Sequence, residues 1–360
     1  MNAPFAIPDG QGTESGSSVR LAQASDAAAW DRYVAENSES MFFHRFGWSR
    51  VISETYGHKP FNLIAEDGRG NTTGILPLIL VTSPFFGRAL ISTAFTVGGG
   101  VLGDAAARSA LLATAQSMAS EYSAKYVELR GGDAPAGWCR KGDTYAGFRK
   151  NMPMDEQDNL EAIPRKKRAD LRKALKNADA GRLDCQCGSG IGSFYPLYAE
   201  SMRNLGTPVP PEKYFRLLQE VFADSLEVSV VKADGTPVTA LISCYHQNTV
   251  LPYFVGASPK ARALHANDYI YWAQMRRAAD LGMSRFDFGR SKIGTGAYAY
   301  KTYWGFKPEP LSYYYYLHGA DQLPDINPNN SKFRLLSNAW KRLPLPVANV
   351  LGPILAGNLA

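Results

Sequence analysis

The sequence predicts an α/β protein with mixed sheets that is built from two similar halves. The chain has 360 residues, roughly twice the length of a typical domain. Apolar residues alternate with a period of two in some segments and recur every three or four residues in others, which indicates strands and helices. The same order of predicted elements occurs twice, at an offset of roughly 160 residues, which indicates an internal duplication.

Each predicted half begins with an aromatic-rich helix followed by a β-hairpin. The hairpins are indicated by two β-rich runs that flank a turn containing Asp-Gly, a dipeptide that favours tight hairpin turns. The helices cover residues 43–56 and 214–223, and the hairpin strands cover residues 61–68 with 73–80 and 228–235 with 238–245.

Each half continues with a further strand, a helix and a short strand that has an acid at its centre. A mixed sheet covered by helices is the expected product of each half. The further strands cover residues 89–95 and 249–255, the helices are marked by apolar residues from Leu111 to Tyr122 and from Ile270 to Ala278, and the short strands carry Glu128 and Asp287.

We expect four segments along the chain. The boundary between the two domains is predicted at the acidic stretch that ends before Pro164. The last segment is first basic and then apolar, so it either anchors the protein to an acidic membrane or a partner, or packs back onto the protein. The segments are a disordered N-terminal tail at 1–18, a first domain at 19–160, a second domain at 161–317 and a C-terminal tail at 318–360.

Composition excludes several classes of protein. With 45% apolar and 20% charged residues, the chain is typical of a globular protein. The four cysteines have neither the density of a disulfide scaffold nor the spacing of a zinc site, and no metal is expected. The N-terminus lacks the basic start and apolar run of a secretory signal, and no apolar stretch reaches the ~18–20 residues that span a bilayer. We therefore expect a cytoplasmic protein.

The basic charge of the chain is concentrated in one predicted helix. Residues 165–182 contain eight Lys or Arg and two acids, so this stretch has a net charge of +6, which equals the net charge of the whole protein. Pro164 suits the first turn of a helix. A polyanion is the expected partner, and RNA, a nucleotide-linked sugar and an anionic lipid surface all qualify. Arg165, Lys166 and Arg168 are the candidate contacts.

The densest candidate site follows the short strand of the second half. Two loop glycines and two cations occur just past the strand end, where α/β folds place ligands. The backbone N–H groups of Gly294 and Gly296, together with Arg290 and Lys292, fit a phosphate group. The alternative is a basic surface loop with aromatic residues packed beneath it.

Lys301 is the candidate catalytic residue of the same segment. It lies among aromatic residues, where a cation in a partly dry site stabilises a developing oxyanion. The neighbouring Tyr300 and Trp304 are candidate substrate contacts. Deprotonation of an acceptor amine is assigned either to Asp287 or to the substrate itself.

Two further motifs lie in the first half. Gly98–Gly103 satisfies the GxGxxG pattern of dinucleotide sites, but the preceding strands form a meander, which favours a tight strand–helix turn. The aromatic cluster that starts the first helix contains His44, Arg45 and Trp48. A buried structural histidine and a substrate contact are both compatible with His44.

Several motifs, taken in order, resemble the FemAB-like proteins, and in particular the branch associated with exosortase (PEP-CTERM) exopolysaccharide systems. The resemblance extends from about Val19 to Leu317. The motifs are FHRxxW at 43–48, GILPL at 74–78, IPRKKR at 163–168, FDFGRSK at 286–292 and YKxxWGF at 300–306.

The resemblance implies two tandem GNAT-like (N-acetyltransferase) domains, in agreement with the duplication. Peptidoglycan members of the family transfer an aminoacyl group from charged tRNA to an amine on a nucleotide-linked precursor. Lys301 matches the essential lysine of the family, and Tyr300 stands where Phe is usual. The chain has no coiled-coil arm, and the glycines after Arg290 do not form a regular CoA loop, so aminoacyl-tRNA and acyl-CoA both stay open as donors.

We therefore expect an acyltransferase that acts on an amine or hydroxyl of a cell-envelope or exopolysaccharide precursor, an anionic or nucleotide-linked small molecule. Lys301 and Asp287 are the expected catalytic residues. No tightly bound cofactor is expected, the acyl donor being a co-substrate, and DNA is not an expected partner. The alternative is a non-catalytic module on a degenerate transferase fold that binds RNA or an anionic membrane, through the basic helix and the C-terminal tail.

Overall fold

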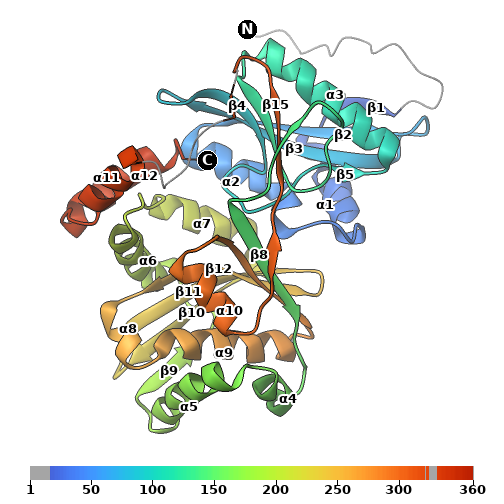
Figure 1. The fold of residues 1–360 in the computed structure, drawn as a ribbon. Helices are drawn as coiled ribbons and strands as arrows, with labels where there is room; N and C mark the ends of the chain where they lie inside the picture. The colour runs from blue at the N-terminus through green and yellow to red at the C-terminus, as the bar shows by residue number, and fades with distance from the viewer. Residues whose placement is uncertain (1–16, 321, 324–330, 360) are drawn as a thin grey trace. The chain divides into compact units, whose positions relative to one another are not determined.

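The computed structural model describes residues 17–320, 322–323 and 331–359, of which 331–334 are described as backbone only (Figure 1). Most of the predicted N-terminal tail lies outside the described residues. The chain forms two compact units. The first unit holds the chain up to Lys141 together with Ser312–Pro324, and the second holds Gly142–Leu311 together with Asp325–Leu359.

The first unit is a mixed sheet with the strand order β1-β2-β3-β4-β6-β15-β7, in which β5 also pairs with β3. Its strands are β1 (Ser18–Leu21), β2 (Lys59–Glu66), β3 (Thr72–Ser83), β4 (Gly87–Ser92), β5 (Leu102–Gly103), β6 (Tyr126–Arg130), β7 (Cys139–Lys141) and β15 (Tyr313–Leu317). Its helices are η1 (Ala24–Asp26), α1 (Ala27–Glu36), η2 (Phe42–His44), α2 (Gly47–Tyr56) and α3 (Ala105–Glu121).

The second unit is a mixed sheet with the strand order β14-β8-β13-β12-β11-β10-β9. Its strands are β8 (Tyr145–Asn151), β9 (Leu183–Gln186), β10 (Leu226–Ala233), β11 (Thr236–His246), β12 (Thr249–Ala257), β13 (Arg285–Lys292) and β14 (Pro308–Pro310). Its helices are α4 (Glu156–Glu161), α5 (Arg165–Asp179), α6 (Ile191–Leu205), α7 (Glu212–Val221), η3 (Ala223–Ser225), α8 (Pro259–Ala263), α9 (Ala266–Asp280), α10 (Gly296–Tyr303), α11 (Ser331–Trp340) and α12 (Leu345–Ala356).

The two sheets match each other strand for strand, which supports the predicted duplication. In each unit an antiparallel meander of three strands is followed by a helix, α3 or α9, and by a strand that pairs in parallel with the end of the meander. The parallel pairing is short in both units. Strands β12 and β13 pair only through Thr249 with Arg285 and Val250 with Phe286, and then diverge. The predicted α/β fold with mixed sheets is confirmed.

One strand of each sheet comes from the other half of the sequence. Strand β8 lies before the predicted boundary at residue 160 but pairs with β13 of the second sheet. Strand β15 lies within the predicted second domain but pairs with β6 of the first sheet. The two units therefore differ from the predicted domains at 19–160 and 161–317. The predicted boundary was placed from the local composition of the acidic stretch, whereas the units are defined by strand pairs between residues far apart in the sequence.

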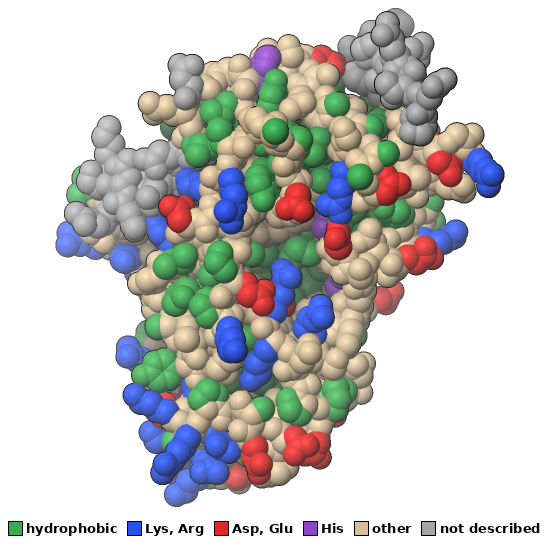
Figure 2. Space-filling model, turned by 45° about the vertical axis from the view of Figure 1, so that its right-hand side comes forward, with side chains coloured by type: hydrophobic (Ala, Val, Ile, Leu, Met, Phe, Trp, Pro, Cys, Tyr) green, Lys and Arg blue, Asp and Glu red, His purple; other side chains and the backbone are tan. Residues whose placement is uncertain are grey.

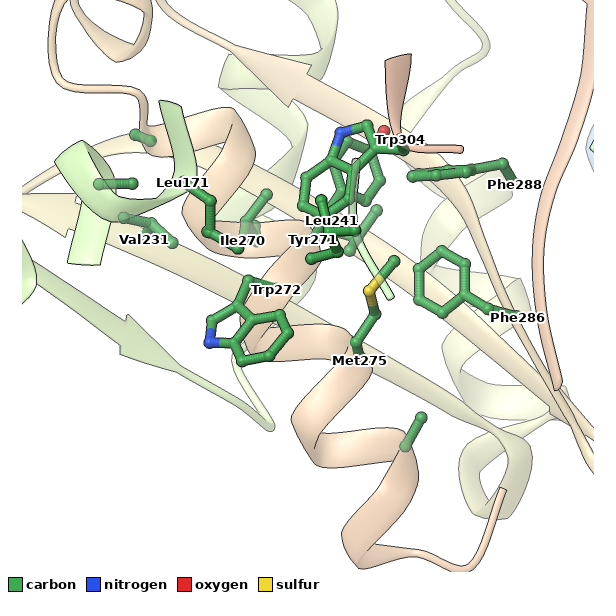
Figure 3. Close-up of a cluster of buried hydrophobic side chains, with 14 of the residues drawn as sticks. Leu171, Val231, Leu241, Ile270, Tyr271, Trp272, Met275, Phe286, Phe288 and Trp304 are labelled. Carbon is green, nitrogen blue, oxygen red and sulfur yellow. The ribbon is translucent and has the colours of Figure 1, made fainter. Parts of the chain in front are cut away.

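The core of the second unit is formed between α9 and the sheet (Figure 3). Helix α9 presents Ile270, Trp272 and Met275 to this core, and strand β13 contributes Phe286 and Phe288. All five side chains are buried. Strand β13 is thus fixed on one face by packing, which gives the residues after it a rigid base.

The glycine run Gly98–Gly103 is a packed turn. Its first three glycines, Gly98–Gly100, are buried. A Cβ atom built on Gly100 would lie 2.4 Å from the carbonyl oxygen of Gly131. The helix that follows begins at Asp104, whose side chain accepts a hydrogen bond from the N–H of Ala107 at 2.8 Å. The glycines therefore permit close backbone contact, and the dinucleotide alternative has no structural support.

Among the described residues, none of the helices is both long and apolar enough to cross a bilayer. The C-terminal helix α12 packs against α6 of the second unit. Of the two alternatives for the C-terminal tail, packing onto the protein is therefore observed for α12.

Candidate active site

The candidate site is built on a bulge in strand β13. The register between β13 and β8 breaks between Asp287 and Arg290. Gly289 has φ +66°, a left-handed conformation that favours glycine. The N–H of Gly289 donates to Oδ1 of Asp287 at 2.7 Å, which closes the bulge. The bulge contains the carbonyl groups of Gly289 and Arg290.

Helix α10 brings Lys301 over this bulge. The helix begins after Thr295, whose side-chain oxygen accepts from the N–H of Tyr298 at 3.3 Å. Nζ of Lys301 donates to the carbonyl oxygen of Arg290 at 2.8 Å and lies 3.4 Å from that of Gly289. An ammonium group has three donors. Two are used within the described chain, which leaves one for a bound group.

The surroundings of Lys301 are partly dry. Burial lowers the pKa of its amine from 10.5 to about 8, with the Arg290 charge acting in the same direction and the Asp287 charge opposing it. The ring centroid of Phe148, from strand β8, lies 5.4 Å from Nζ. A cation in such a site interacts more strongly with a developing negative charge than it would in water.

Asp287 is buried and held from two sides. Its Oδ2 accepts from Nε of Arg149 at 2.8 Å, and its Oδ1 accepts from the Gly289 N–H. Arg149 lies on β8, so this ion pair joins the neighbouring strands β8 and β13 at the bulge. Because both of its oxygens accept hydrogen bonds, the Asp287 carboxylate stabilises the conformation of the bulge. It thereby also fixes the position of the carbonyl groups that bind Lys301.

The predicted phosphate-binding residues lie in the segment from β13 to α10. The Arg290 guanidinium lies 4.5 Å from the ring centroid of Tyr145, and Lys292 is half-buried at the end of β13. Gly294 and Gly296 are exposed, and a Cβ atom built on either glycine would have no neighbour within 4 Å. Their backbone is therefore open to an approaching group at the start of α10.

Two predicted substrate contacts are interior residues. Trp304 has no exposed surface and packs against Tyr271 and Phe288, as Figure 3 shows. The hydroxyl of Tyr300 donates to Oδ1 of Asp268 at 2.7 Å, and burial raises its pKa. Trp304 is fully buried and Tyr300 is half-buried, and their assignment as substrate contacts stays a prediction.

The basic helix α5 adjoins α10. Nζ of Lys166 donates to the hydroxyl of Tyr303 at 3.0 Å, and Lys166 and Arg165 are exposed, whereas Arg168 is half-buried. Figure 2 shows Lys and Arg side chains gathered at the lower end of the second unit, where α5 lies. Helix α5 is formed as predicted, and its first turn lies against the helix that carries Lys301.

Lys167, on the same helix, has a different environment. It is buried and forms an ion pair with Asp268, which is buried on α9 and also accepts from Tyr300. This three-residue cluster ties α5, α9 and α10 together. Sequence reasoning counted Lys167 within the basic run and did not single out Asp268, because Lys167 and Tyr300 lie far from Asp268 in the sequence.

The candidate residues at the start of the first unit have structural contacts. His44 is buried, with Nδ1 accepting from the Met41 N–H at 2.9 Å and Nε2 lying 3.0 Å from the Gly100 carbonyl oxygen. Burial lowers its pKa to about 4, so the ring is neutral. Trp48 is buried and donates to the Ala94 carbonyl oxygen at 3.1 Å. Arg45 is half-buried, 5.9 Å from the ring of Phe42.

Sequence reasoning missed the contribution of strand β8 to the site. Tyr145, Phe148 and Arg149 all come from this strand. Their only local signal is a short β-rich run, and the pairing that brings them to Lys301 joins residues more than a hundred positions apart in sequence. Among the described residues, no group of three or more His, Cys, Asp or Glu side chains is arranged to hold a metal ion.

Residues 165–302 match the family model described as an acetyltransferase (GNAT) domain. The match extends from the first residue of α5 to α10 and includes Lys301. This part of the chain is similar to a GNAT domain. None of the curated protein sequences matches the chain.

Solved structures extend the likeness to most of the chain. The crystal structure of FemX has a TM-score of 0.67 with 13% identity, covering 84% of this chain and 98% of FemX. The structure of L-PGS from Bacillus licheniformis has a TM-score of 0.56 with 13% identity, covering 91% of this chain and 99% of L-PGS. A tandem GNAT protein from the clavulanic acid biosynthesis pathway has a TM-score of 0.52 with 12% identity, covering 85% and 99%.

The fold is that of the tandem GNAT proteins. Within that class it is the FemAB-like arrangement that the motifs indicated, and the likeness to FemX confirms that prediction at the level of the fold. The family match and the fold together support an acyl- or aminoacyltransferase in general terms. The association with exosortase systems is not tested by these comparisons and stays a prediction.

Proposed function

We propose that this protein transfers an acyl or aminoacyl group to an amine or hydroxyl of a cell-envelope or exopolysaccharide precursor, with Lys301 as the catalytic residue. The observation that carries the proposal is the position of Lys301, whose amine is buried over the β13 bulge with one donor left for a ligand. The bulge adjoins the place where β12 and β13 stop pairing, which leaves strand backbone available to an extended acyl group.

The proposed reaction needs no enzyme nucleophile. The acceptor attacks the acyl carbonyl directly, so a C–N or C–O bond forms while the bond to the donor sulfur or oxygen breaks. The Lys301 ammonium donates to the tetrahedral oxyanion, where its effect is largest because water is partly excluded. The leaving group takes up the proton that the acceptor loses. Asp287, held by Arg149, acts as a positioning residue for the bulge.

The proposed donor carries phosphate groups, as acyl-CoA and aminoacyl-tRNA both do. Exposed Gly294 and Gly296 offer backbone N–H groups beside Lys301. Arg165 and Lys166, at the start of α5, supply exposed positive charge next to α10. The acceptor is proposed to be anionic or nucleotide-linked, and the reaction is placed in the cytoplasm, where such precursors and donors are made.

Mass spectrometry of precursor pools tests the proposal. Pools from cells with and without the protein are compared, and the added mass identifies the acyl group. The Lys301→Ala variant is expected to lower kcat on the order of 10²-fold or more, because the oxyanion loses its cation. Lys260→Ala is the matched control, since it removes an exposed lysine of α8, outside the segment from β13 to α10. An unchanged rate in Lys301→Ala would remove Lys301 from the mechanism.

A further inference from the structure

Helix α12 is apolar apart from Asn349. One face consists of small residues and packs onto the second unit, with Ala348, Gly352 and Ala356 all buried. Gly352 lies so close to this unit that a Cβ atom would come within 2.9 Å of the backbone nitrogen of Val209. Because the contact requires a glycine, the small-residue face of α12 is fixed against the protein.

The other face of α12 presents large aliphatic side chains to solvent. Val347, Val350, Leu351 and Ile354 are exposed, and their spacing of three and four residues places them along one stripe of the helix. Val350 and Ile354 keep 68% and 66% of their surface accessible. Aliphatic groups gathered in this way are unusual on a protein surface and mark an interaction site.

Neighbouring elements extend the apolar surface. Leu335 and Leu336 of α11 and Leu205 at the end of α6 are exposed. Helix α11 meets α6 at Gly206, where a Cβ atom would clash with the side chain of Ser337. The exposed aliphatic residues of α6 and α11 therefore flank a direct contact between these helices.

The charge around this surface has a single sign. Residues 331–360 contain four Lys or Arg and no Asp or Glu, so the segment has a net charge of +4. Lys341 and Arg342, in the turn between α11 and α12, are exposed. Within this segment the apolar stripe is accompanied by cations and by no acids, a combination that complements the acyl region and headgroups of an anionic bilayer.

We propose that the exposed face of α12, together with Lys341 and Arg342, docks the protein onto an anionic phospholipid surface. Helix α12 is about 18 Å long, too short to span a bilayer, and its small-residue face is occupied by the protein. It therefore lies in the plane of the interface. A symmetric dimer through this face would bring two segments of +4 charge together, which disfavours a second copy as the occupant.

Sedimentation of the full-length protein with lipid vesicles tests this proposal. Vesicles of phosphatidylcholine with 30% phosphatidylglycerol are compared with phosphatidylcholine alone, and binding is expected to the anionic vesicles only. The double variant Val350→Asp with Ile354→Asp is expected to abolish binding, since both side chains are exposed and the substitutions leave the core intact. Lys341→Gln with Arg342→Gln is expected to weaken binding about thirty-fold at low salt.

The matched control is Phe85→Asp, which changes an equally exposed aromatic residue in the turn between β3 and β4 and is expected to bind normally. Equal binding to both vesicle types, or none to either, would overturn the proposal. So would self-association in sedimentation velocity that the Val350 and Ile354 double variant removes. The test uses no acyl transfer, and Lys301→Ala is expected to bind vesicles like the wild type, so its outcome is separate from that of the proposed function.

Discussion

At the scale of single residues, the chemistry depends on how buried charges are balanced. Lys301 is stabilised by two backbone carbonyl oxygens rather than by a carboxylate partner, so burial is free to lower its pKa to about 8. Lys167, one turn into α5, is instead paired directly with Asp268. The first arrangement suits a group that meets a transient negative charge, and the second suits a fixed structural contact.

The Lys167–Asp268 pair makes a prediction about stability. Replacing Asp268 with Ala leaves the Lys167 charge buried without its partner, and also removes the acceptor for the Tyr300 hydroxyl. We expect the free energy of unfolding to fall by about 3–5 kcal/mol, measured by urea denaturation.

The matched control is Asp170→Ala, which removes the exposed partner of Lys173 and is expected to change stability by less than about 1 kcal/mol. Lys167→Met in the Asp268→Ala background removes the unpaired charge and is expected to restore part of the loss. A single variant as stable as the wild type would mean that the buried pair does not hold the three helices together.

At the scale of elements, the site depends on a bulge, a short helix and a basic helix. The β13 bulge supplies the carbonyl groups, α10 supplies Lys301, and the start of α5 contacts α10 through Lys166 and Tyr303. Figure 3 shows Trp304, the residue after α10, in the same core as side chains of α9 and β13. Each element is therefore fixed by packing, so the position of Lys301 does not depend on a loop.

The exposed face of α5 makes a prediction about polyanion binding. Arg172 and Lys176 lie four residues apart on one exposed face, away from the first turn that meets α10. The affinity for tRNA falls with salt, and the slope of log affinity against log salt depends on the number of phosphate contacts. Replacing both residues with Gln removes two contacts of about 0.7 each, so the slope is expected to become shallower by about 1.4. Fluorescence anisotropy at several salt concentrations measures this slope.

The control for this experiment is Arg69→Gln, in the exposed turn between β2 and β3, which is expected to leave the slope unchanged. Coenzyme A binding, measured alongside, is expected to be insensitive to Arg172 and Lys176 because a single CoA is too compact to extend along the helix. An identical slope in the double variant would exclude this face of α5 as the polyanion contact.

At the scale of the whole molecule, each predicted half of the sequence supplies one strand to the other sheet. Strand β8 pairs in the second sheet and β15 pairs in the first, so neither half contains all the strands of its own sheet. A fragment ending at residue 160 lacks β15 and exposes the edge of β6, while a fragment starting at 161 lacks β8, a strand between β13 and β14. An open sheet edge and a missing internal strand both destabilise a fold. We expect neither fragment, expressed alone, to give a cooperative thermal transition.

Co-expression of the two fragments is the control, since it supplies both exchanged strands and is expected to give a folded complex. Circular dichroism with temperature reports the transition in each case. A cooperative transition in either fragment alone would show that the exchanged strand is dispensable for that unit.

Sequence reasoning succeeded where the information is local. The helices, hairpins and meanders were predicted because hydrophobic period and turn residues specify them within a few positions. Lys301 was found because its motif is contiguous in sequence. Arg149 and Asp268 were missed because their roles come from partners more than 30 positions away in the chain. The interior position of Trp304 also follows only from the packing.

The pH dependence of acyl transfer tests the central claim most directly. Because burial lowers the Lys301 pKa to about 8, the amine is charged below this pH and neutral above it. If the ammonium stabilises the oxyanion, the rate is highest below pH 8 and falls about tenfold per pH unit above it.

The measurement follows transfer of labelled acyl group to the acceptor that mass spectrometry identifies, for the wild type and for Lys301→Arg. The arginine side chain stays charged, so the variant is expected to keep its activity to higher pH and to lose the inflection near 8. A wild-type rate that rises through pH 8, or an inflection that persists unchanged in Lys301→Arg, would contradict the assignment of Lys301 as the oxyanion-stabilising cation.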